Sequence, residues 1–170
     1  MDVVGRFWSR VDKNGPVSPV DNTSCWLRTT SLDSHGYAQF YCEGRKILAH
    51  RFSYELINGP IPDGPDGRTL RLDHRHTCPK NCVRPEHLRP ATAKQNAENR
   101  AGATRESKSG VRGVFPNTGK NKGKKNGWQA IVGHNGKKHY LGVFSSIEEA
   151  EAAVVAKRAE LFTHNDSDRL

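Results

Sequence analysis

The chain has 170 residues, of which 34% are hydrophobic, and a formal net charge of +9 at pH 7. This length allows one ordinary domain or two small ones, and the low apolar content argues against a large core that is stable without a metal, disulfide or partner. The positive charge favours an anionic partner, most often nucleic acid, because lysine and arginine neutralise phosphates.

The sequence has no apolar run approaching the roughly 18–20 residues that a membrane span needs. Its first stretch, MDVVGRFWSRVDKNG, lacks the apolar core of a signal peptide. We therefore expect a cytoplasmic protein without membrane contact. Cytoplasmic thiols are kept reduced, so the four cysteines are interpreted as metal ligands or buried thiols rather than disulfides.

The first hundred residues predict short strands and helices. In chain order these are a short amphipathic segment within residues 3–13, a strand near 25–30, two strands within 36–50, a helix over 49–58 and a strand over 68–74. The paired strands should turn at Glu43-Gly44. The helix is expected to bury four apolar positions, Ala49, Phe52, Leu56 and Ile57. A second helix should follow Thr92, which forms a capping box with Gln95.

Composition changes near residue 101, where AGATRESKSG is small and polar, as linkers are. Beyond it, GVRGVF, GWQAIVG and KKHYLGVF predict three strands, and SSIEEAEAAVVAKRAELF predicts a helix with serine at its start and glutamates in its first turn. We therefore expect a first domain over residues 1–100, a linker over 101–108, a second domain over 109–164 and a flexible tail over 165–170.

A cysteine and histidine group indicates a metal site. Cys78 and Cys82 are separated by three residues and His87 follows five positions later, a spacing by which zinc collects ligands from a short loop. A fourth ligand would have to come from Cys25 or Cys42. The alternative is that reduced thiols share this loop without a metal. The poor local core favours the metal, because the loop has little other reason to fold.

Asp73, His74 and Asn96 form a second candidate site, with a carboxylate, an imidazole and an amide. A strand-end carboxylate with a helix amide opposite suits a hard divalent cation such as Mg²⁺ or Mn²⁺. His74 could then act as a base, because a neutral imidazole with a pKa near its ordinary value of about 6.5 accepts a proton from water at neutral pH. The alternative is a surface hydrogen-bonding pair at a strand end.

Residues 6–99 carry several motifs in a fixed order. They read FWSRVDKN, CWL, GYAQF, AHRFSYEL, NGPIP and LDHRHTCPKNCVRPEHLRPATAKQNAEN. In this order they resemble the HNH (His-Me finger) endonucleases, in particular the homing-type enzymes of phages and mobile introns. The resemblance implies a ββα-metal fold in which Asp73 and Asn96 bind the catalytic cation and His74 is the general base. His50 and Arg51, in AHRF, also match the family; the alternatives for them are a phosphate contact and a capping or packing role at the start of a helix.

Zinc-containing members of that family also imply a structural metal. The implied ligands are Cys25, Cys78, Cys82 and His87. Cys42 is then most simply a thiol on a strand, and it is the alternative to Cys25 as the fourth zinc ligand. Arg84 stands where many relatives have an asparagine, and this departure concerns the geometry of the loop rather than the catalytic residues.

In the second half, SGVRGVF and GWQAIVGHNGKKHYLGVFSSIEEAEAAVVAKRAELF cover roughly residues 109–162. They resemble the plant ethylene-response-factor (APETALA-type) DNA-binding domain, which occurs fused to HNH homing endonucleases. The resemblance implies that a three-stranded sheet contacts double-stranded DNA while the helix packs behind it. The implied DNA-facing residues are Arg112, Trp128, Gln129, Lys138 and Tyr140. Ile131, Val132 and Gly133 stand where the family often has charged groups, so the target sequence does not follow from the resemblance.

The sequence thus predicts an α+β protein. A zinc-stabilised ββα-metal (His-Me finger) nuclease domain should precede a three-stranded antiparallel sheet packed on one helix. We expect a site-directed, homing-type DNA endonuclease with catalytic Mg²⁺ or Mn²⁺ and structural Zn²⁺, which nicks DNA as a monomer or acts as a homodimer on it. The rival is a catalytically inactive, zinc-containing DNA-binding regulator, and the intact set of Asp73, His74 and Asn96 favours the enzyme.

Overall fold

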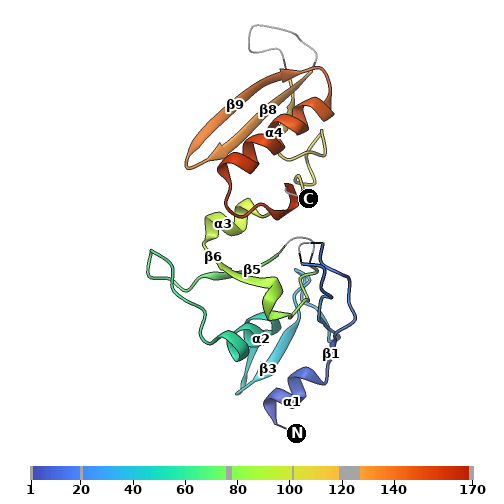
Figure 1. Ribbon diagram of the computed structural model, residues 1–170, viewed down its shortest axis with the longest axis vertical. Coiled ribbons are helices and arrows are strands. Elements are labelled where there is room, and N and C mark those ends of the chain that lie inside the picture. The colour runs from blue at the N-terminus through green and yellow to red at the C-terminus, as the bar shows by residue number, and fades with distance from the viewer. Residues whose placement is uncertain (1, 20, 76–77, 101, 119–126, 169–170) are drawn as a thin grey trace. The chain divides into compact units, whose positions relative to one another are not determined.

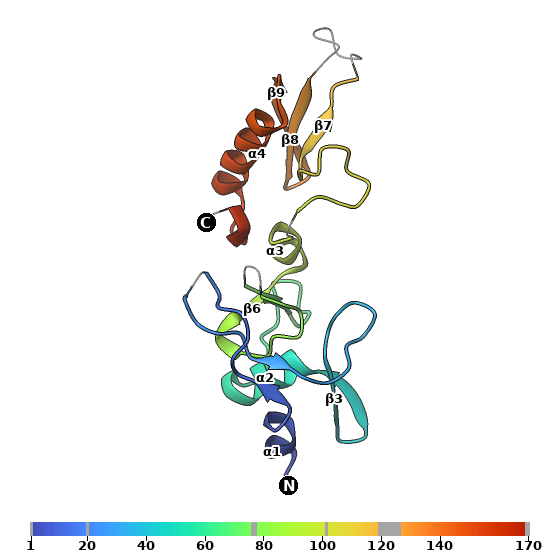
Figure 2. The same cartoon turned by 90° about the vertical axis from the view of Figure 1, so that its right-hand side faces the viewer.

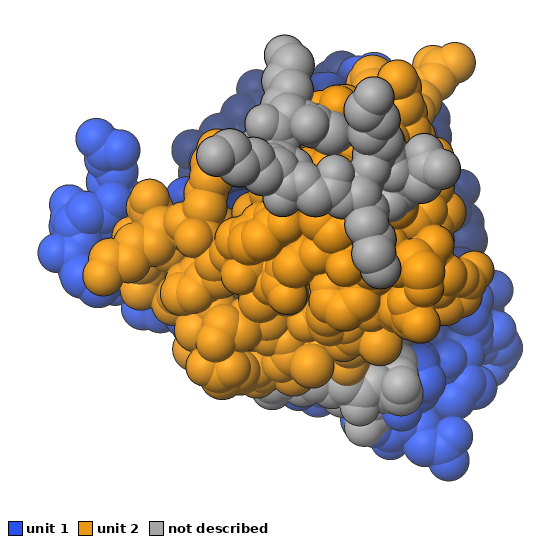
Figure 3. Space-filling model, turned by 90° about the horizontal axis from the view of Figure 1, so that it is seen from above, with its two compact units in different colours: residues 1–99, 170 blue, residues 100–169 orange. Residues whose placement is uncertain are grey.

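The structure is a computed structural model that describes residues 2–19, 21–75, 78–100, 102–118 and 127–168. The chain divides into two compact units, residues 1–99 and residues 100–169, which Figure 1 shows as ribbons and Figure 3 as space-filling surfaces. Each unit combines helices with small antiparallel sheets, so the expected α+β class is confirmed. Within the described ranges, no helix is long and apolar enough to cross a membrane.

Unit 1, residues 1–99, contains three two-stranded antiparallel sheets, β1-β2, β3-β4 and β5-β6. Its strands are β1 (Val11–Asp12), β2 (Leu27–Arg28), β3 (Gln39–Cys42), β4 (Arg45–Leu48), β5 (Arg71–His74) and β6 (Leu88–Ala91). Its helices are α1 (Val3–Trp8), α2 (Ala49–Asn58), the 3₁₀ turn η1 (Pro85–His87) and α3 (Ala93–Glu98). The larger of its two cores is formed by Phe7, Ala38, Phe40, Cys42, Ala49 and Val83.

The β3-β4 hairpin turns at the predicted place. Glu43 and Gly44 have φ values of 49° and 77°, and two successive residues with positive φ form the two-residue turn whose twist matches that of the strands. Glycine at the second position avoids the steric cost that a Cβ meets there. The hairpin leads directly into α2, whose first residue, Ala49, donates its N–H to Ala38 O at 2.9 Å.

Helix α2 buries a different set of side chains from the one expected. Its buried residues are Ala49, His50 and Ser53, whereas Leu56 and Ile57 are 39% and 60% exposed. All buried positions fall within the first five residues of the helix, so its last turn extends beyond this small core. A histidine and a serine are thus buried in place of the expected leucine and isoleucine. The His50 ring lies beside His74 of β5, and Ser53 Oγ donates to Val83 O.

Helix α3 begins as the capping box predicts. Thr92 Oγ1 accepts a hydrogen bond from Gln95 N at 3.2 Å, and Gln95 Oε1 accepts one from Thr92 N at 2.9 Å. The helix follows β6 directly, and β6 pairs with β5 so that Asp73 lies opposite Arg89 and His74 opposite Leu88. The strand end that carries the Asp-His pair is therefore enclosed by β6 on one side and by the end of α3 on another.

Unit 2, residues 100–169, is a three-stranded antiparallel sheet covered on one face by a helix (Figures 1 and 2). The strands are β7 (Val114–Pro116), β8 (Trp128–His134) and β9 (Lys137–Phe144), and the order is β7-β8-β9. They are followed by α4 (Ile147–Leu161) and the 3₁₀ turn η2 (Asp166–Asp168). Ser146 caps α4 by accepting from Glu149 N at 3.1 Å. The core consists of Val114, Ala130, Val132, Ala150, Val154 and Phe162.

The expected linker and tail are both structured where the chain is described. Ser107 Oγ lies 3.2 Å from Ser109 Oγ, which donates to Val114 O at 2.7 Å, so the polar segment is attached to β7. At the other end Asn165 is 1% exposed, and Arg158 Nη2 donates to Asp168 Oδ1 at 3.0 Å. Residues 102–108 and 165–168 are therefore parts of unit 2, while residues 101, 169 and 170 lie outside the described ranges.

Candidate metal centre and active site

The structure brings together all four residues expected to hold the structural metal. The ligand atoms of Cys25, Cys78, Cys82 and His87 all lie within 4.8 Å of one another. His87 Nδ1 is 3.6 Å from Cys25 Sγ, 3.4 Å from Cys78 Sγ and 3.7 Å from Cys82 Sγ. Cys42 instead lies in the core beside Phe40, so Cys25 is the fourth member of the cluster.

These separations match a tetrahedral metal site. Bonds of about 2.3 Å to sulfur and about 2.0–2.1 Å to nitrogen, at tetrahedral angles, place two sulfurs about 3.8 Å apart and a sulfur and a nitrogen about 3.6 Å apart. Cys25 Sγ and Cys78 Sγ are 3.5 Å apart, and the three sulfur–nitrogen distances range from 3.4 to 3.7 Å. The Cys₃His cluster can therefore hold a metal such as zinc.

Turns and short backbone contacts aim these side chains inward. Cys82 N donates to Pro79 O at 2.8 Å, which folds the Cys78–Cys82 loop back on itself. Two backbone hydrogen bonds hold Cys25 in place, since its N donates to Pro16 O at 2.8 Å and its O accepts from Gly15 N at 3.1 Å. A Cβ on Gly15 would lie 2.6 Å from Cys25 O, so this approach requires glycine.

The imidazole of His87 is oriented by two polar residues behind it. His87 Nε2 lies 2.7 Å from Thr23 Oγ1 and 3.4 Å from Asp21 Oδ2. Because a carboxylate only accepts, this arrangement places the ring proton on Nε2 and leaves the Nδ1 lone pair directed at the three sulfurs. Such an outer partner commonly fixes a metal-binding histidine in one tautomer.

Of the three cysteines in the cluster, Cys82 is the one that most readily forms a thiolate. A hydrogen bond with the Cys78 thiol lowers the pKa of Cys82 to about 5, against the effect of burial. Burial raises the pKa of Cys25 to about 11, and the hydrogen bond with Cys82 raises the pKa of Cys78. A thiolate is the form that binds a metal ion, so Cys82 is prepared for coordination.

Asp73 lies at the end of β5 among hydrogen-bond donors. Its side chain is buried, and its Oδ2 accepts from Arg89 Nε and Nη2 at 3.2 and 3.1 Å and from Asn99 Nδ2 at 2.9 Å. Arg89 reaches the carboxylate because it is the cross-strand partner of Asp73. Asn99 Nδ2 also donates to His74 O at 3.0 Å, which fixes the end of α3 to the end of β5.

The amide that contacts Asp73 is that of Asn99, whereas the sequence indicates Asn96. Asn96 lies within α3 with a partly buried side chain, and Asn99 is the C-cap of the same helix. Residues three positions apart share a helix side, so the spacing identifies the correct face. It does not reveal which turn of the helix lies against the strand, and the structure places the last turn there.

His74 is held by the loop that carries the metal cluster. Its Nε2 lies 3.0 Å from the backbone O of Cys82. A carbonyl oxygen only accepts, so Nε2 carries the proton and the lone pair is on Nδ1. Burial lowers the pKa of His74, which keeps the ring neutral at physiological pH. Cys82 therefore contributes its sulfur to the cluster and its carbonyl to the orientation of His74.

Two further rings pack around His74. The ring centroid of His50 lies 5.0 Å from that of His74, and the ring of Tyr37 lies 6.1 Å from His74 and 5.3 Å from His50. Burial and the neighbouring His74 lower the pKa of His50 to about 3. His50 Nδ1 is buried without a hydrogen-bond partner among the described residues. The sequence indicated His50 only through the AHRF motif, with phosphate contact and packing at the helix start as alternatives.

The residues expected to face DNA fall on two sides of unit 2. Three lie on the sheet face that points away from α4, and they are Gln129, Lys138 and Tyr140. Trp128 packs instead against the core. Arg112 Nη1 donates to Arg100 O at 3.0 Å, and its guanidinium lies 5.4 Å from the centroid of the Phe162 ring. Arg112 and Trp128 thus have structural contacts within the unit.

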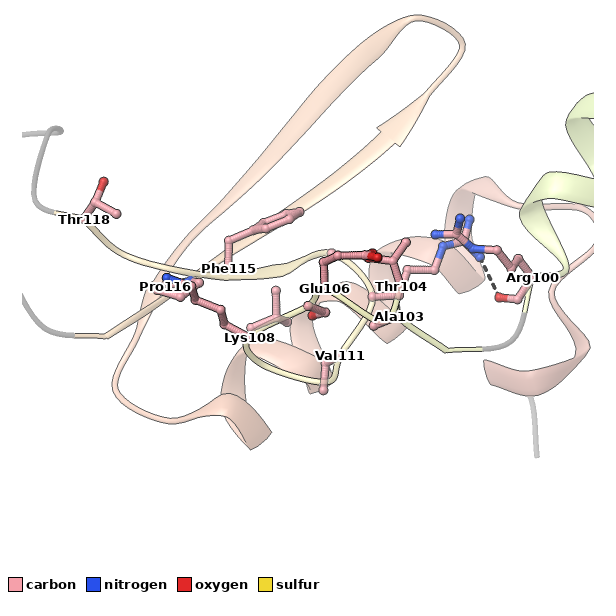
Figure 4. A pocket seen from close by; sticks show the side chains of 13 residues that line it. Arg100, Ala103, Thr104, Glu106, Lys108, Val111, Phe115, Pro116 and Thr118 are labelled. Carbon is pink, nitrogen blue, oxygen red and sulfur yellow. Dashed lines mark hydrogen bonds between the residues drawn. The ribbon is translucent and has the colours of Figure 1, made fainter.

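A cavity of ≈ 380 Å³ lies beside β7, between the strand and the segment that precedes it (Figure 4). Residues between Arg100 and Thr118 line it, with Phe115 among them and the hydrogen bond from Arg112 to Arg100 O at one end. None of the lining residues belongs to the Cys₃His cluster or to the Asp73-His74 pair, so the cavity is not part of either candidate site.

Comparison with models of protein families, with curated proteins and with solved structures found no match to this chain.

Proposed function

We propose that the protein is a metal-dependent DNA endonuclease in which Asp73 and His74 of unit 1 hydrolyse a phosphodiester and unit 2 binds the DNA. The observation that carries the proposal is the imposed orientation of two adjacent side chains. Arg89 and Asn99 fix the carboxylate of Asp73, and the Cys82 carbonyl fixes the tautomer of His74. A surface hydrogen-bonding pair has no need of such support, whereas catalysis requires groups held in a productive geometry.

His74 supplies the base in this reaction. With its Nε2 proton donated to Cys82 O, the Nδ1 lone pair takes a proton from water, and the water oxygen attacks phosphorus. The bond from phosphorus to the 3′ oxygen then breaks, and this oxygen takes a proton from solvent water, which leaves a 3′-hydroxyl and a 5′-phosphate. Asp73 and Asn99 offer the carboxylate and amide oxygens that would hold Mg²⁺ or Mn²⁺. When bound, such a cation would polarise the phosphate and stabilise the leaving oxygen.

The Cys₃His cluster is assigned to structural Zn²⁺. Four protein ligands fill a tetrahedral site and leave no open position for substrate or water, which distinguishes structural from catalytic zinc. Because Cys82 both joins the cluster and contacts His74, a bound zinc ion would also fix the position of the base. Unit 2 then holds this site near its target, since attachment raises the local concentration of the catalytic unit without new contacts.

One observation favours the rival function, a DNA-binding regulator without catalysis. The guanidinium of Arg89 lies on Asp73 Oδ2 and compensates the negative charge that attracts a cation. Under this alternative the network around Asp73 is a structural anchor for β5, β6 and α3.

A plasmid assay with analysis of the product ends separates the two functions. Zinc-loaded protein is incubated with supercoiled plasmid with and without Mg²⁺, and the nicked product is treated with DNA ligase. The enzyme is expected to produce open-circular DNA only with the cation, and ligase should reseal it because the ends are a 3′-hydroxyl and a 5′-phosphate. Folded, zinc-loaded protein that binds the plasmid but leaves it supercoiled with Mg²⁺ and with Mn²⁺ would establish the regulator.

A further inference from the structure

Among the described residues of unit 2, α4 covers one face of the sheet and no helix covers the other. In β8 the side chains of Ala130 and Val132 are buried toward α4, and side chains alternate between the two faces of a strand. The residues between them, with their cross-strand partners in β7 and β9, therefore form the opposite face. We call this the open face, and its residues are Phe115, Gln129, Ile131, Gly133, Lys138, Tyr140 and Val143.

The open face is strongly apolar for a solvent-exposed surface. Phe115, Tyr140 and Val143 are 51%, 54% and 37% exposed. A hollow of ≈ 410 Å³ is lined by Phe115, Ile131, Gly133 and Lys138. A larger side chain would fit at position 133, because a Cβ added to Gly133 would meet nothing within 4 Å. Its lack of a side chain keeps the hollow open between an aromatic ring and a lysine.

The distribution of charged residues in unit 2 indicates the kind of partner that the open face binds. Strands β7, β8 and β9 contain Lys137 and Lys138 and no acidic residue, whereas the acidic side chains follow in α4 on the other side of the sheet. The acidic residues of α4 are Glu148, Glu149, Glu151 and Glu160. The sequence between β7 and β8 adds four more lysines, in residues outside the described ranges. An apolar surface with Lys137 and Lys138 beside it suits a partner with apolar groups between phosphates.

We propose, resting on the DNA-binding function above, that the open face reads A·T base pairs in the major groove through the C5-methyl groups of thymine. Thymine is the one base that presents a methyl group there, and apolar side chains are its usual contacts. Guanine is most often read by arginine or lysine. The open face carries no arginine, and Arg112, the nearest in sequence to β7, is hydrogen-bonded to Arg100 O instead. Its one lysine, Lys138, is assigned here to phosphate contact rather than to guanine.

Gln129 can recognise adenine, the base that pairs with thymine. Its Nε2 donates to Asn117 Oδ1 at 2.9 Å, and Asn117 is 7% exposed, so the amide is held in one orientation. The second Nε2 hydrogen and Oε1 form the donor and acceptor pair that glutamine presents to adenine N7 and N6. Gln129 lies in one cross-strand row with Phe115 and Val143, so the amide and the apolar side chains meet the same stretch of groove.

The test compares duplexes that differ only in the methyl group. Full-length protein, zinc-loaded and without Mg²⁺, is titrated by fluorescence anisotropy with an A·T-rich duplex, with the same duplex in which uracil replaces every thymine, and with a G·C-rich duplex. Uracil keeps the hydrogen-bonding edge and phosphates of thymine. Burial of one methyl group corresponds to about fourfold in affinity, so the A·T duplex should bind about fourfold tighter than the A·U duplex for each thymine contacted.

Two substitutions place the effect on the open face. Phe115→Ser should remove the preference for thymine over uracil while leaving residual binding through the lysines. Gly133→Leu, which fills the hollow in open space, should weaken A·T binding more than G·C binding. Ile57→Ser is the matched control, because Ile57 is an apolar side chain of unit 1 with 60% exposure, and it should leave all three affinities unchanged.

Equal binding of the A·T and A·U duplexes, or a preference for the G·C duplex, would overturn the inference while leaving the endonuclease proposal standing. Tighter binding to single-stranded oligothymidine than to any duplex would overturn it too, since the face would then stack on bases instead of reading a groove. Concentration-dependent dimerisation that Phe115→Ser abolishes would assign the face to a second copy of the chain. Failure to bind any of these nucleic acids, with no plasmid nicking, would refute the proposed function itself.

Discussion

Replacing Cys25 by serine should unfold unit 1 and leave unit 2 folded. The other three ligands of the metal cluster lie within residues 78–87, so Cys25 closes a loop in which it and Cys78 are 53 residues apart. In the chain-entropy treatment of a cross-link, closing a loop of this length contributes about 4 kcal/mol. Domains are stable by about 5–15 kcal/mol in total, and the main core of unit 1 has only six buried residues. The loss therefore removes a large part of its stability.

The measurement is hydrogen exchange by mass spectrometry, which follows each unit separately, together with the zinc content of the protein. Cys25→Ser is expected to lose zinc and the protection of β5 and β6, while β8 and β9 keep theirs. The matched control is Cys42→Ser, the same chemical change at a buried thiol outside the cluster. It should retain zinc and cost about 1–3 kcal/mol through the buried hydroxyl. Normal zinc content and protection in Cys25→Ser, or equal effects of the two substitutions, would refute the reasoning.

Three further predictions address contacts that the structure adds to the sequence. Asn99→Ala should weaken cation binding, and with it nicking at limiting Mg²⁺, by about 10–100-fold, whereas Asn96→Ala should remain close to wild type. If Asn96→Ala had the larger effect, Asn96 would be the cation ligand, as expected from the sequence. His50 has a pKa of about 3 in the folded state, below its ordinary value of about 6.5. Unit 1 should therefore lose up to about 1.4 kcal/mol of stability per pH unit as pH falls through that window, and thermal melts of His50→Phe should lose this contribution to the slope. Asp168→Ala leaves the buried guanidinium of Arg158 without its carboxylate, so the melting temperature of unit 2 should fall by several degrees. An unchanged melting temperature would instead support the flexible tail expected from the sequence for residues 165–168.

The features that could be predicted from the sequence depend on neighbouring residues. The capping box of Thr92 and Gln95 is contained within four residues, and the Glu43-Gly44 turn within two, so the local physical chemistry is sufficient for both. The spacing of Cys78 and Cys82 is local in the same sense. The choice between Cys25 and Cys42 is not local, because it depends on which distant strand is folded against the loop.

The features that could not be predicted depend on tertiary packing. Asn96 and Asn99 share a helix side, and only the docking of α3 against β5 selects Asn99. His50 occupies an ordinary position in the first turn of a helix, and its burial beside His74 becomes visible only when α2 and β5 are brought together. Arg112 matches a DNA-binding pattern in sequence, yet its guanidinium packs on Phe162, which follows it by 50 positions in the chain.

The central claim is that His74 activates water for hydrolysis of DNA. The direct measurement is the rate of supercoiled-plasmid nicking by wild type, His74→Ala and His35→Ala, each checked to contain about one zinc per chain. His35 is a solvent-exposed histidine of the same unit and is the matched control. The account predicts that His74→Ala loses about 10²–10⁴ in rate while His35→Ala nicks like wild type. Nicking by zinc-loaded His74→Ala at the wild-type rate would contradict it.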